Sequence, residues 1–275
     1  MELRSQHQER AQFIQVKGHA NKLSRMHNRF IGRISKNHRE SFGRAVMNAG
    51  PIDLLTGRRE ISAVILDYGE VLCSPPSPDA IAGMAGVLGI DAQNFLAIYR
   101  SSRNPYDRGD LTAHAYWVEF ARRANVPIGH QDIRKLRRLD VAMWSNVTEE
   151  MTEWLARVHS GGFRTAILSN MQTDMAAHTR NNFAWLRHID HQVLSCEVRS
   201  IKPDPAIYRH ALSLLEVPPS EVLFVDDREE NIQAARSAGI RGILFQSVSQ
   251  FRVELQALGF PILPAPGSAG QRSPE

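Results

Sequence analysis

The chain is poor in cysteine, since its 275 residues include only Cys73 and Cys196. Two thiols cannot build the framework of bridges that holds small secreted domains, so we expect a reducing, cytoplasmic environment. Long apolar runs are absent as well, because no stretch approaches the roughly 20 residues that a membrane-spanning helix needs. No signal-peptide pattern opens the sequence. We therefore expect a cytoplasmic protein without a membrane span, in which Cys73 is a small buried side chain and not a nucleophile.

Acidic residues are scarce at the N-terminal end. Residues 1–60 contain 12 Lys or Arg and 5 Asp or Glu, a net charge of +7, whereas the whole chain carries +4. The other 215 residues therefore carry −3, and the sequence pI near 9.3 comes from this extension. Three interpretations stay open: a solvated, flexible tail, which we favour; a contact with nucleic acid or an acidic surface; and an organelle transit peptide.

Three apolar segments, residues 63–67, 165–170 and 222–227, end abruptly in polar residues. Such a run is typical of a strand that is buried on both faces of a parallel sheet. Ligands of open α/β folds bind at the carboxyl edge of that sheet, where the terminal polar residues lie. We expect the segments to bring together carboxylates, a hydroxyl, an amide and, from the Lys-Pro-Asp-Pro loop, an ammonium: Asp67, Asp226, Asp227, Ser169, Asn170 and Lys202.

The order of these four segments resembles that of the haloacid dehalogenase-like (HAD) hydrolases, from about residue 61 to residue 260. The motifs resemble those of one subgroup in particular. Its first motif reads Asp-x-Gly-x-Val, here residues 67–71, and its last reads Asp-Asp-x-x-x-Asn, here residues 226–231. The resemblance implies an α/β fold, a three-layer doubly wound parallel sheet with strand order 3-2-1-4-5. Most members are magnesium-dependent phosphatases, so it also implies Mg²⁺ and a small phosphorylated substrate.

Between the first and second strands, residues 79–147 have helical periodicity and no good strand. Apolar residues recur at helical spacing near 79–88, 93–102, 111–124 and 131–140. In the family this insertion is a small helical C1 cap. We therefore expect a core of residues 61–78 and 148–260, a cap of 79–147, and a flexible tail of 261–275, which is rich in Pro, Gly and Ser.

The resemblance implies a role for each residue at the sheet edge. Asp67 would be the nucleophile, forming an aspartyl-phosphate. Ser169, Asn170 and Lys202 would bind the phosphate, with Ser169 and Lys202 stabilising the transferring group. The metal ligands would be Asp67, the Gly69 carbonyl and one of the acidic pair, with Asp227 preferred as the direct ligand and Asp226 orienting Lys202 or a bound water. Asn231 would support a ligand by a hydrogen bond.

One position departs from the family pattern. Most phosphatases of the family carry a second Asp two residues after the nucleophile, as general acid and base, and Gly69 stands there. Proton transfer of this kind is worth about 10²–10⁴-fold in rate. Glu70 is adjacent but points the other way in extended backbone. We consider Asp107, Asp110 or His114 as substitutes, and list as candidates for contacting the substrate Glu70, Arg103, Tyr106, His114 and Trp117.

Two other functions stay open. A 2-haloacid dehalogenase-like hydrolase also uses an Asp nucleophile without the second Asp, although it has no need of the Asp226–Asp227 pair. A catalytically silent binding protein is favoured only by Gly69 and by the basic extension.

Overall fold

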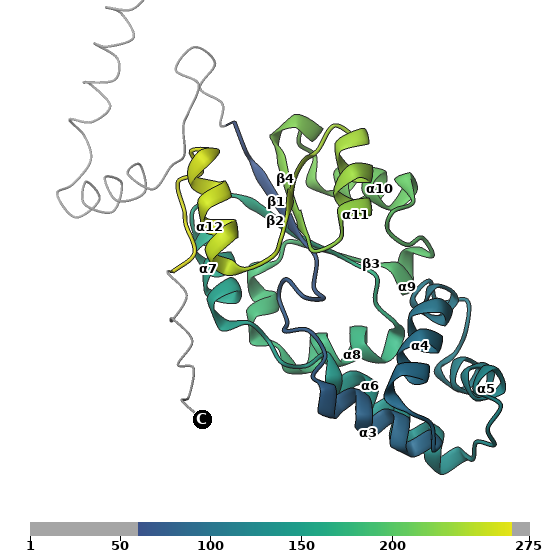
Figure 1. Ribbon diagram of the computed structural model, residues 1–275. Coiled ribbons are helices and arrows are strands. Elements are labelled where there is room, and N and C mark those ends of the chain that lie inside the picture. The colour runs from purple at the N-terminus through teal and green to yellow at the C-terminus, as the bar shows by residue number, and fades with distance from the viewer. Residues whose placement is uncertain (1–59, 266–275) are drawn as a thin grey trace, which may run out of the picture. The chain divides into compact units, whose positions relative to one another are not determined.

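Five short strands form one parallel sheet in the described part of the chain (Figure 1). The computed structural model describes residues 60–265, so our expectations for residues 1–59 and 266–275 lie outside it. The strands are β1 (Ala63–Leu66), β2 (Arg164–Ser169), β3 (His191–Leu194), β4 (Val222–Asp226) and β5 (Arg241–Leu244). Their order is β3-β2-β1-β4-β5, which confirms the expected 3-2-1-4-5 arrangement.

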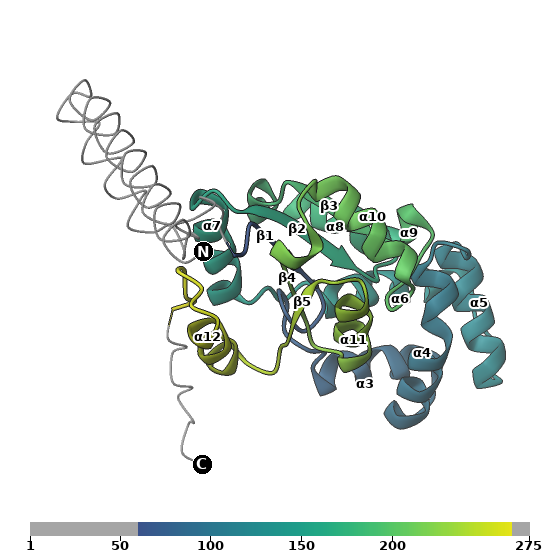
Figure 2. The same ribbon diagram turned by 90° about the horizontal axis from the view of Figure 1, so that it is seen from above.

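Side chains of the central strand alternate between two apolar layers. Val64 and Leu66 pack in a cluster with α7 (Glu149–Ser160), α8 (Thr173–Asn182) and α12 (Val248–Ala257). Ala63 and Ile65 face the other way, toward α10 (Pro205–Leu215) and α11 (Glu229–Ser237). This period of two follows from the pleat of a strand. Both faces of the sheet are therefore covered by helices, as Figures 1 and 2 show, which explains why β1 has no polar residue.

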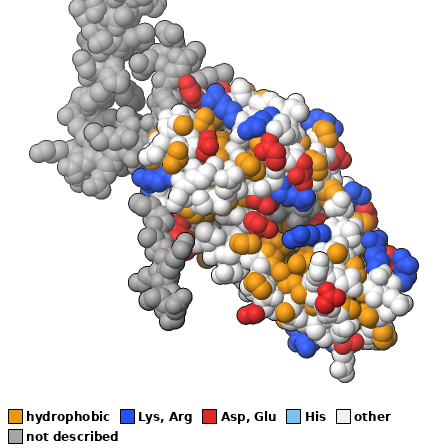
Figure 3. All heavy atoms as spheres, viewed as in Figure 1, with side chains coloured by type: hydrophobic (Ala, Val, Ile, Leu, Met, Phe, Trp, Pro, Cys, Tyr) orange, Lys and Arg blue, Asp and Glu red, His pale blue; other side chains and the backbone are white. Residues whose placement is uncertain are grey.

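Four helices lie between β1 and α7. They are α3 (Pro78–Leu88), α4 (Ala92–Asp107), α5 (Ala113–Ala124) and α6 (His130–Met143). Local signals set their starts: the side chains of Ser77, Asp91 and Thr112 each accept a hydrogen bond from a backbone N–H of the first turn. The helices enclose an apolar core of their own, around Phe95, Trp117 and other buried side chains. Figure 3 shows hydrophobic side chains also gathered on the surface over these helices.

A short helix, α9 (Ser195–Val198), follows β3 directly. The strand ends at Leu194 because Ser195 turns its hydroxyl back to the backbone of Met171, whose N–H it accepts at 2.9 Å. Two 3₁₀ turns, η1 (Ala184–His188) and η2 (Pro219–Glu221), precede β3 and β4. Within residues 60–265, no single helix has both the length and the apolarity of a membrane span; α3 and α4 pass that test only together, across a 91° bend.

Candidate active site

The carboxyl edge of the sheet holds a buried ammonium between two carboxylates. Lys202 Nζ lies 2.8 Å from Asp67 Oδ1 and 2.7 Å from Asp226 Oδ2. Asp67 follows β1, Asp226 ends β4, and Lys202 is in the loop before α10, so three separate segments supply the set. All three side chains are at least nine-tenths buried. The structure therefore brings these sequence-predicted residues into direct contact.

Asp226 is fixed by the start of the helix that follows it. Its Oδ1 accepts hydrogen bonds from the Arg228 N–H at 2.9 Å and from Asn231 Nδ2 at 2.8 Å. The Tyr208 hydroxyl in turn donates to the Asn231 carbonyl at 3.0 Å, which ties α10 to α11. Both oxygens of Asp226 are thus engaged, so this carboxylate holds Lys202 in place. Sequence reasoning missed Tyr208, because nothing in its helical pattern distinguishes it from a core aromatic residue.

The Lys202 loop is held by Asn170. The Asn170 side chain accepts from the Lys202 N–H at 2.8 Å and donates to the Lys202 carbonyl at 2.9 Å. This pair of bonds fixes the backbone from which the lysine side chain extends. Ser169 is buried and ends β2 one residue earlier, beside the strand that carries Asp67. The Asn170 amide therefore positions the lysine loop, while contacts of Ser169 and of nearby N–H groups with a phosphate stay predictions.

Negative charge exceeds positive charge at this edge. Burial raises the pKa of Asp67 to about 6, although the adjacent Lys202 opposes the shift. Burial and then the Asp67 charge raise the pKa of Asp227 to about 7. Burial alone would lower the pKa of Lys202, but Asp226 and Asp67 outweigh it, so the ammonium form is retained. With three carboxylates and one ammonium, this edge of the sheet therefore favours the binding of a cation.

That donor set fits a hard divalent cation. One oxygen each of Asp67, Asp226 and Asp227 lie within 4.8 Å of one another, and Asp227 is the most exposed of the three. Magnesium prefers carboxylate, carbonyl and water oxygens and commonly keeps several waters, which suits an edge that is partly open. Both oxygens of Asp226 already have partners, whereas Lys202 and the Tyr68 N–H both contact Oδ1 of Asp67. Asp67 and Asp227 are therefore the carboxylates best placed as direct ligands.

The segment after Asp67 is fixed by two hydrogen bonds of Tyr68, one of them to the inserted helices. The Tyr68 N–H donates to Asp67 Oδ1 at 2.7 Å, and the Tyr68 hydroxyl donates to the Trp144 carbonyl at the end of α6. A β-carbon at Gly69 would lie 3.5 Å from Trp144 Cζ3, an ordinary van der Waals contact. Glu70 has a φ of 56°, whereas Gly69 is not among the positive-φ glycines. The turn's strain therefore falls on Glu70, and position 69 can accept a side chain.

Cys73 follows this segment and is buried, as the sequence indicated. Burial raises the pKa of its thiol to about 12, so the reactive thiolate is scarce at neutral pH.

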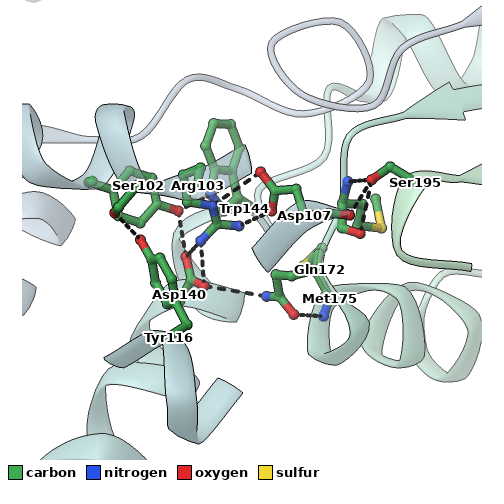
Figure 4. Close-up of polar contacts among 11 residues, drawn as sticks. Ser102, Arg103, Asp107, Tyr116, Asp140, Trp144, Gln172, Met175 and Ser195 are labelled. Atoms are coloured by element: carbon green, nitrogen blue, oxygen red, sulfur yellow. Dashed lines mark hydrogen bonds and ion pairs between the residues drawn. The ribbon is translucent and has the colours of Figure 1, made fainter. Parts of the chain in front are cut away.

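Arg103 lies in a buried polar cluster between the inserted helices and the sheet side (Figure 4). Its guanidinium pairs with Asp107 Oδ1 at 2.8 Å and with Asp140 Oδ2 at 2.9 Å. Asp140 Oδ1 also accepts from the Tyr99 hydroxyl at 2.6 Å, and Trp144 Nε1 donates to that hydroxyl at 3.1 Å. Arg103 is therefore committed to protein partners, and its predicted contact with a substrate has no support in this geometry.

Asp140 is a member of this cluster that sequence reasoning missed, although a signal was present. It stands on the apolar stripe of α6 with Ile133, Leu136 and Met143, where a buried charge needs a partner. Asp107, a candidate substitute acid, is likewise occupied by Arg103, while burial raises its pKa to about 6.

The remaining candidate residues lie within the inserted helices. Tyr106 stacks on Tyr116 at a ring-centroid distance of 4.3 Å, and Trp117 is fully buried in the same core. His114 is exposed and stacks on His130 at 5.4 Å. Asp110 contacts Arg199 at 3.2 Å and Arg108 at 3.3 Å. These contacts give each side chain a protein partner, although the Tyr106 hydroxyl and Trp117 Nε1 are buried without a hydrogen-bond partner among the described residues. The remaining candidate, Glu70, lies three residues after Asp67.

Comparison with known proteins agrees with this architecture. The model of the haloacid dehalogenase-like hydrolase family matches residues 38–239, and the chain therefore belongs to that family. The match begins at residue 38, earlier than residue 61, where the motifs placed the start of the resemblance. The enzyme class defined by the fold and the family is thus a hydrolase.

Individual relatives differ in what they do. The chain is 30% identical over 224 residues to mouse acyl-CoA dehydrogenase family member 10, covering 75% of this chain and 20% of that protein. It is 28% identical over 144 residues to (S)-2-haloacid dehalogenase 1 of Pseudomonas sp., covering 52% and 62%. A HAD-family enzyme from Bacteroides thetaiotaomicron, solved as a magnesium complex, has the same fold, with a TM-score of 0.59, 17% identity and coverage of 68% and 94%.

The chain spans only about a fifth of the length of the mouse protein and about a quarter or less of several other curated relatives. The activities of those longer proteins therefore do not transfer to it directly.

Proposed function

We propose that this chain is a magnesium-dependent phosphatase that hydrolyses a small phosphorylated metabolite through an aspartyl-phosphate. The observation that carries the proposal is Lys202 bridging Asp67 and Asp226 with Asp227 close by. A carboxylate nucleophile must approach an anionic phosphate, so the site needs positive charge beside the nucleophile. Lys202 supplies one charge, and Asp67 with Asp227 and the Gly69 carbonyl would hold Mg²⁺, which supplies the rest.

The residues of the chain then act in order. Asp67 attacks phosphorus, and the bond to the leaving oxygen breaks while the phosphoryl group passes to the carboxylate. Lys202, Ser169 and backbone N–H groups near Asn170 stabilise the transferring oxygens. Water then attacks the aspartyl-phosphate, releasing phosphate and restoring Asp67. No acidic side chain stands at residue 69 to move protons in either step, so a phosphate ester with a poor leaving group should react slowly.

The alternative is a 2-haloacid dehalogenase, and Gly69 is the observation that favours it. A halide leaves as an anion and requires no proton, so the missing acid would not slow the first step of that reaction. Asp67 would form an ester with the substrate carbon, which water would then cleave. The Asp226–Asp227 pair weighs against this alternative, because a carbon–halogen displacement needs no divalent cation.

Substrate selection would lie with the α3–α6 insertion, acting as a cap, and with residues 70–77, which follow the nucleophile. We keep residues 61–78 and 148–260 as the proposed core. A cytoplasmic location also stays a prediction.

One panel separates these functions. Phosphate esters and 2-chloropropionate are offered to the full chain with Mg²⁺ or with excess EDTA, while released phosphate and chloride are measured. Phosphate release that requires Mg²⁺ supports the phosphatase, whereas EDTA-resistant chloride release identifies the dehalogenase. Turnover of neither class of substrate, in a protein that still binds phosphate, would point to a silent binding protein.

A further inference from the structure

A groove of about 810 Å³ lies between α6 and α8, and none of the proposed active-site residues lines it. One wall carries Arg134, Arg138 and Val141, which follow one another at intervals of four and three residues and so share one face of α6. The other wall carries Asp174, His178 and Asn181 at the same helical spacing on α8. The volume is within the roughly 300–1,000 Å³ of small-molecule sites. We call this feature the α6–α8 groove.

The α6–α8 groove carries an excess of positive charge. Asp174 is its one carboxylate, and it is engaged by Arg137 through two bonds, Nε to Oδ2 at 2.7 Å and Nη2 to Oδ1 at 2.8 Å. Arg134 and Arg138 are exposed, and no carboxylate among residues 60–265 forms an ion pair with either. Two like charges one helical turn apart repel each other, so an anion between them would be stabilised. The guanidinium fork matches phosphate oxygens in particular.

The rest of the groove suits the organic part of such an anion. Val141 and Ala142 provide apolar surface on α6. Across from them, His178 has both ring nitrogens within 3.2 Å of polar groups, Nε2 from Ser145 Oγ and Nδ1 from Asn182 Nδ2. The imidazole is therefore held in one orientation beside the arginines. An arginine pair, a fixed imidazole, amide groups and apolar surface together resemble the composition of a ligand site more than that of a solvated helix face.

The groove also connects with the nucleophile segment. His178 packs edge-on against Phe183 at a centroid distance of 5.4 Å, and Phe183 stacks on Tyr68 at 6.3 Å. Tyr68 follows Asp67, and its hydroxyl donates to the carbonyl of Trp144, the neighbour of Ser145 in the groove. Contacts from both α6 and α8 therefore connect the groove with Tyr68, the residue beside Asp67.

We propose that the α6–α8 groove is a second ligand site that binds a small phosphorylated organic molecule, separate from the Asp67 site. Arg134 and Arg138 bind the phosphate, and Val141, Ala142 and His178 contact the remainder of the molecule. An occupant would bridge α6 and α8 and so act on the Tyr68 segment as an effector.

Calorimetric titration of the full chain with AMP, and separately with pyrophosphate, tests the site directly. Excess EDTA is present, because without a cation the carboxylates of the Asp67 site repel phosphate and leave the groove as the site of binding. The variant Arg134→Gln/Arg138→Gln removes the proposed phosphate contacts. Its matched control, Arg100→Gln/Arg209→Gln, removes the same charge from two exposed arginines outside the groove.

We expect saturable binding of one AMP per chain, weakened at least about tenfold in the groove variant, since a charge-assisted hydrogen bond contributes roughly this much. The control should stay within about twofold of the original chain. Equal binding by the original chain and a folded groove variant would overturn the proposal, as would no saturable binding at millimolar AMP and pyrophosphate. Binding of pyrophosphate but not AMP would contradict the role given to the apolar wall. These readouts need no turnover, so they stand even if the chain hydrolyses no phosphate ester.

Discussion

Gly69→Asp tests whether the missing acid limits turnover. The backbone permits the change, because Gly69 does not use the left-handed conformation and its β-carbon would lie 3.5 Å from Trp144 Cζ3. With p-nitrophenyl phosphate, whose leaving group needs little protonation, the original chain should show a burst of nitrophenol and then a slow steady state. The burst reports an accumulating aspartyl-phosphate, since water attack still lacks its base. In Gly69→Asp the burst should disappear and steady-state turnover should rise by about 10²–10⁴-fold.

Gly69→Ala is the matched control, because it places the same β-carbon against Trp144 without a carboxyl group. Its stability should stay within about 1 kcal/mol of the original chain, since an ordinary contact is added and the unfolded chain loses some freedom. Its burst should persist. Stopped-flow absorbance follows both phases, and thermal unfolding checks that each variant is folded. No burst in the original chain, together with no gain in a folded Gly69→Asp variant, would refute the reasoning about residue 69.

Three further outcomes follow from the site and from the buried cluster. Asp67→Asn should abolish phosphate release while retaining the thermal transition; a folded variant with near-original rates would exclude Asp67 as nucleophile. Asp227→Asn should weaken the binding of Mg²⁺, measured through its effect on activity, at least tenfold. The same change should raise the melting temperature of the metal-free chain at pH 7 but not at pH 3. The folded-state pKa of Asp227 is raised to about 7, so the cost of ionising Asp227 in the folded chain grows as pH rises above the unfolded pKa of 3.8. Equal melting temperatures of the two chains across that range would contradict this reasoning. Asp140→Asn should lower the free energy of unfolding by about 3 kcal/mol in urea, because it leaves Arg103 with one buried partner fewer, while the exposed Asp110→Asn should cost less than about 1 kcal/mol. Equal losses would show that burial does not decide the cost.

The sheet and its functional edge were predictable because each signal is local. An apolar run that ends in a polar residue marks both a buried strand and the side chain at its carboxyl end, as with β4 and Asp226. Parallel strands place those ends at one edge of the sheet, while the pairing of β1 with β4 makes Asp67 and Asp226 neighbours and the loop before α10 brings Lys202 to both. Strand order itself came from the resemblance, since local pattern does not encode which strand lies beside which.

Contacts between distant segments could not be predicted in the same way. Arg103 has the residue type of a substrate-binding group, and its burial against Asp140, 37 residues further on, is visible only in three dimensions. Asn170 likewise has ordinary turn chemistry in the sequence, while its two bonds to the Lys202 backbone require the loop of another strand. Asp140 was detectable in principle, because a charge on an apolar helix stripe demands a partner, but the stripe does not identify which one.

These contacts tie the segment that follows Asp67 to the inserted helices. Tyr68 is tied to the Trp144 carbonyl, and the Trp144 indole is tied through Tyr99 to Asp140, which is paired with Arg103. The same indole lies 3.5 Å from the position that a β-carbon at residue 69 would take, which is where most phosphatases of this family carry their second Asp. A displacement of α6 would therefore move both Trp144 and Tyr68, the residue next to Asp67. The buried cluster around Arg103 links α6 to α4 and to the start of α8, so the inserted helices help to fix the residues that surround Gly69.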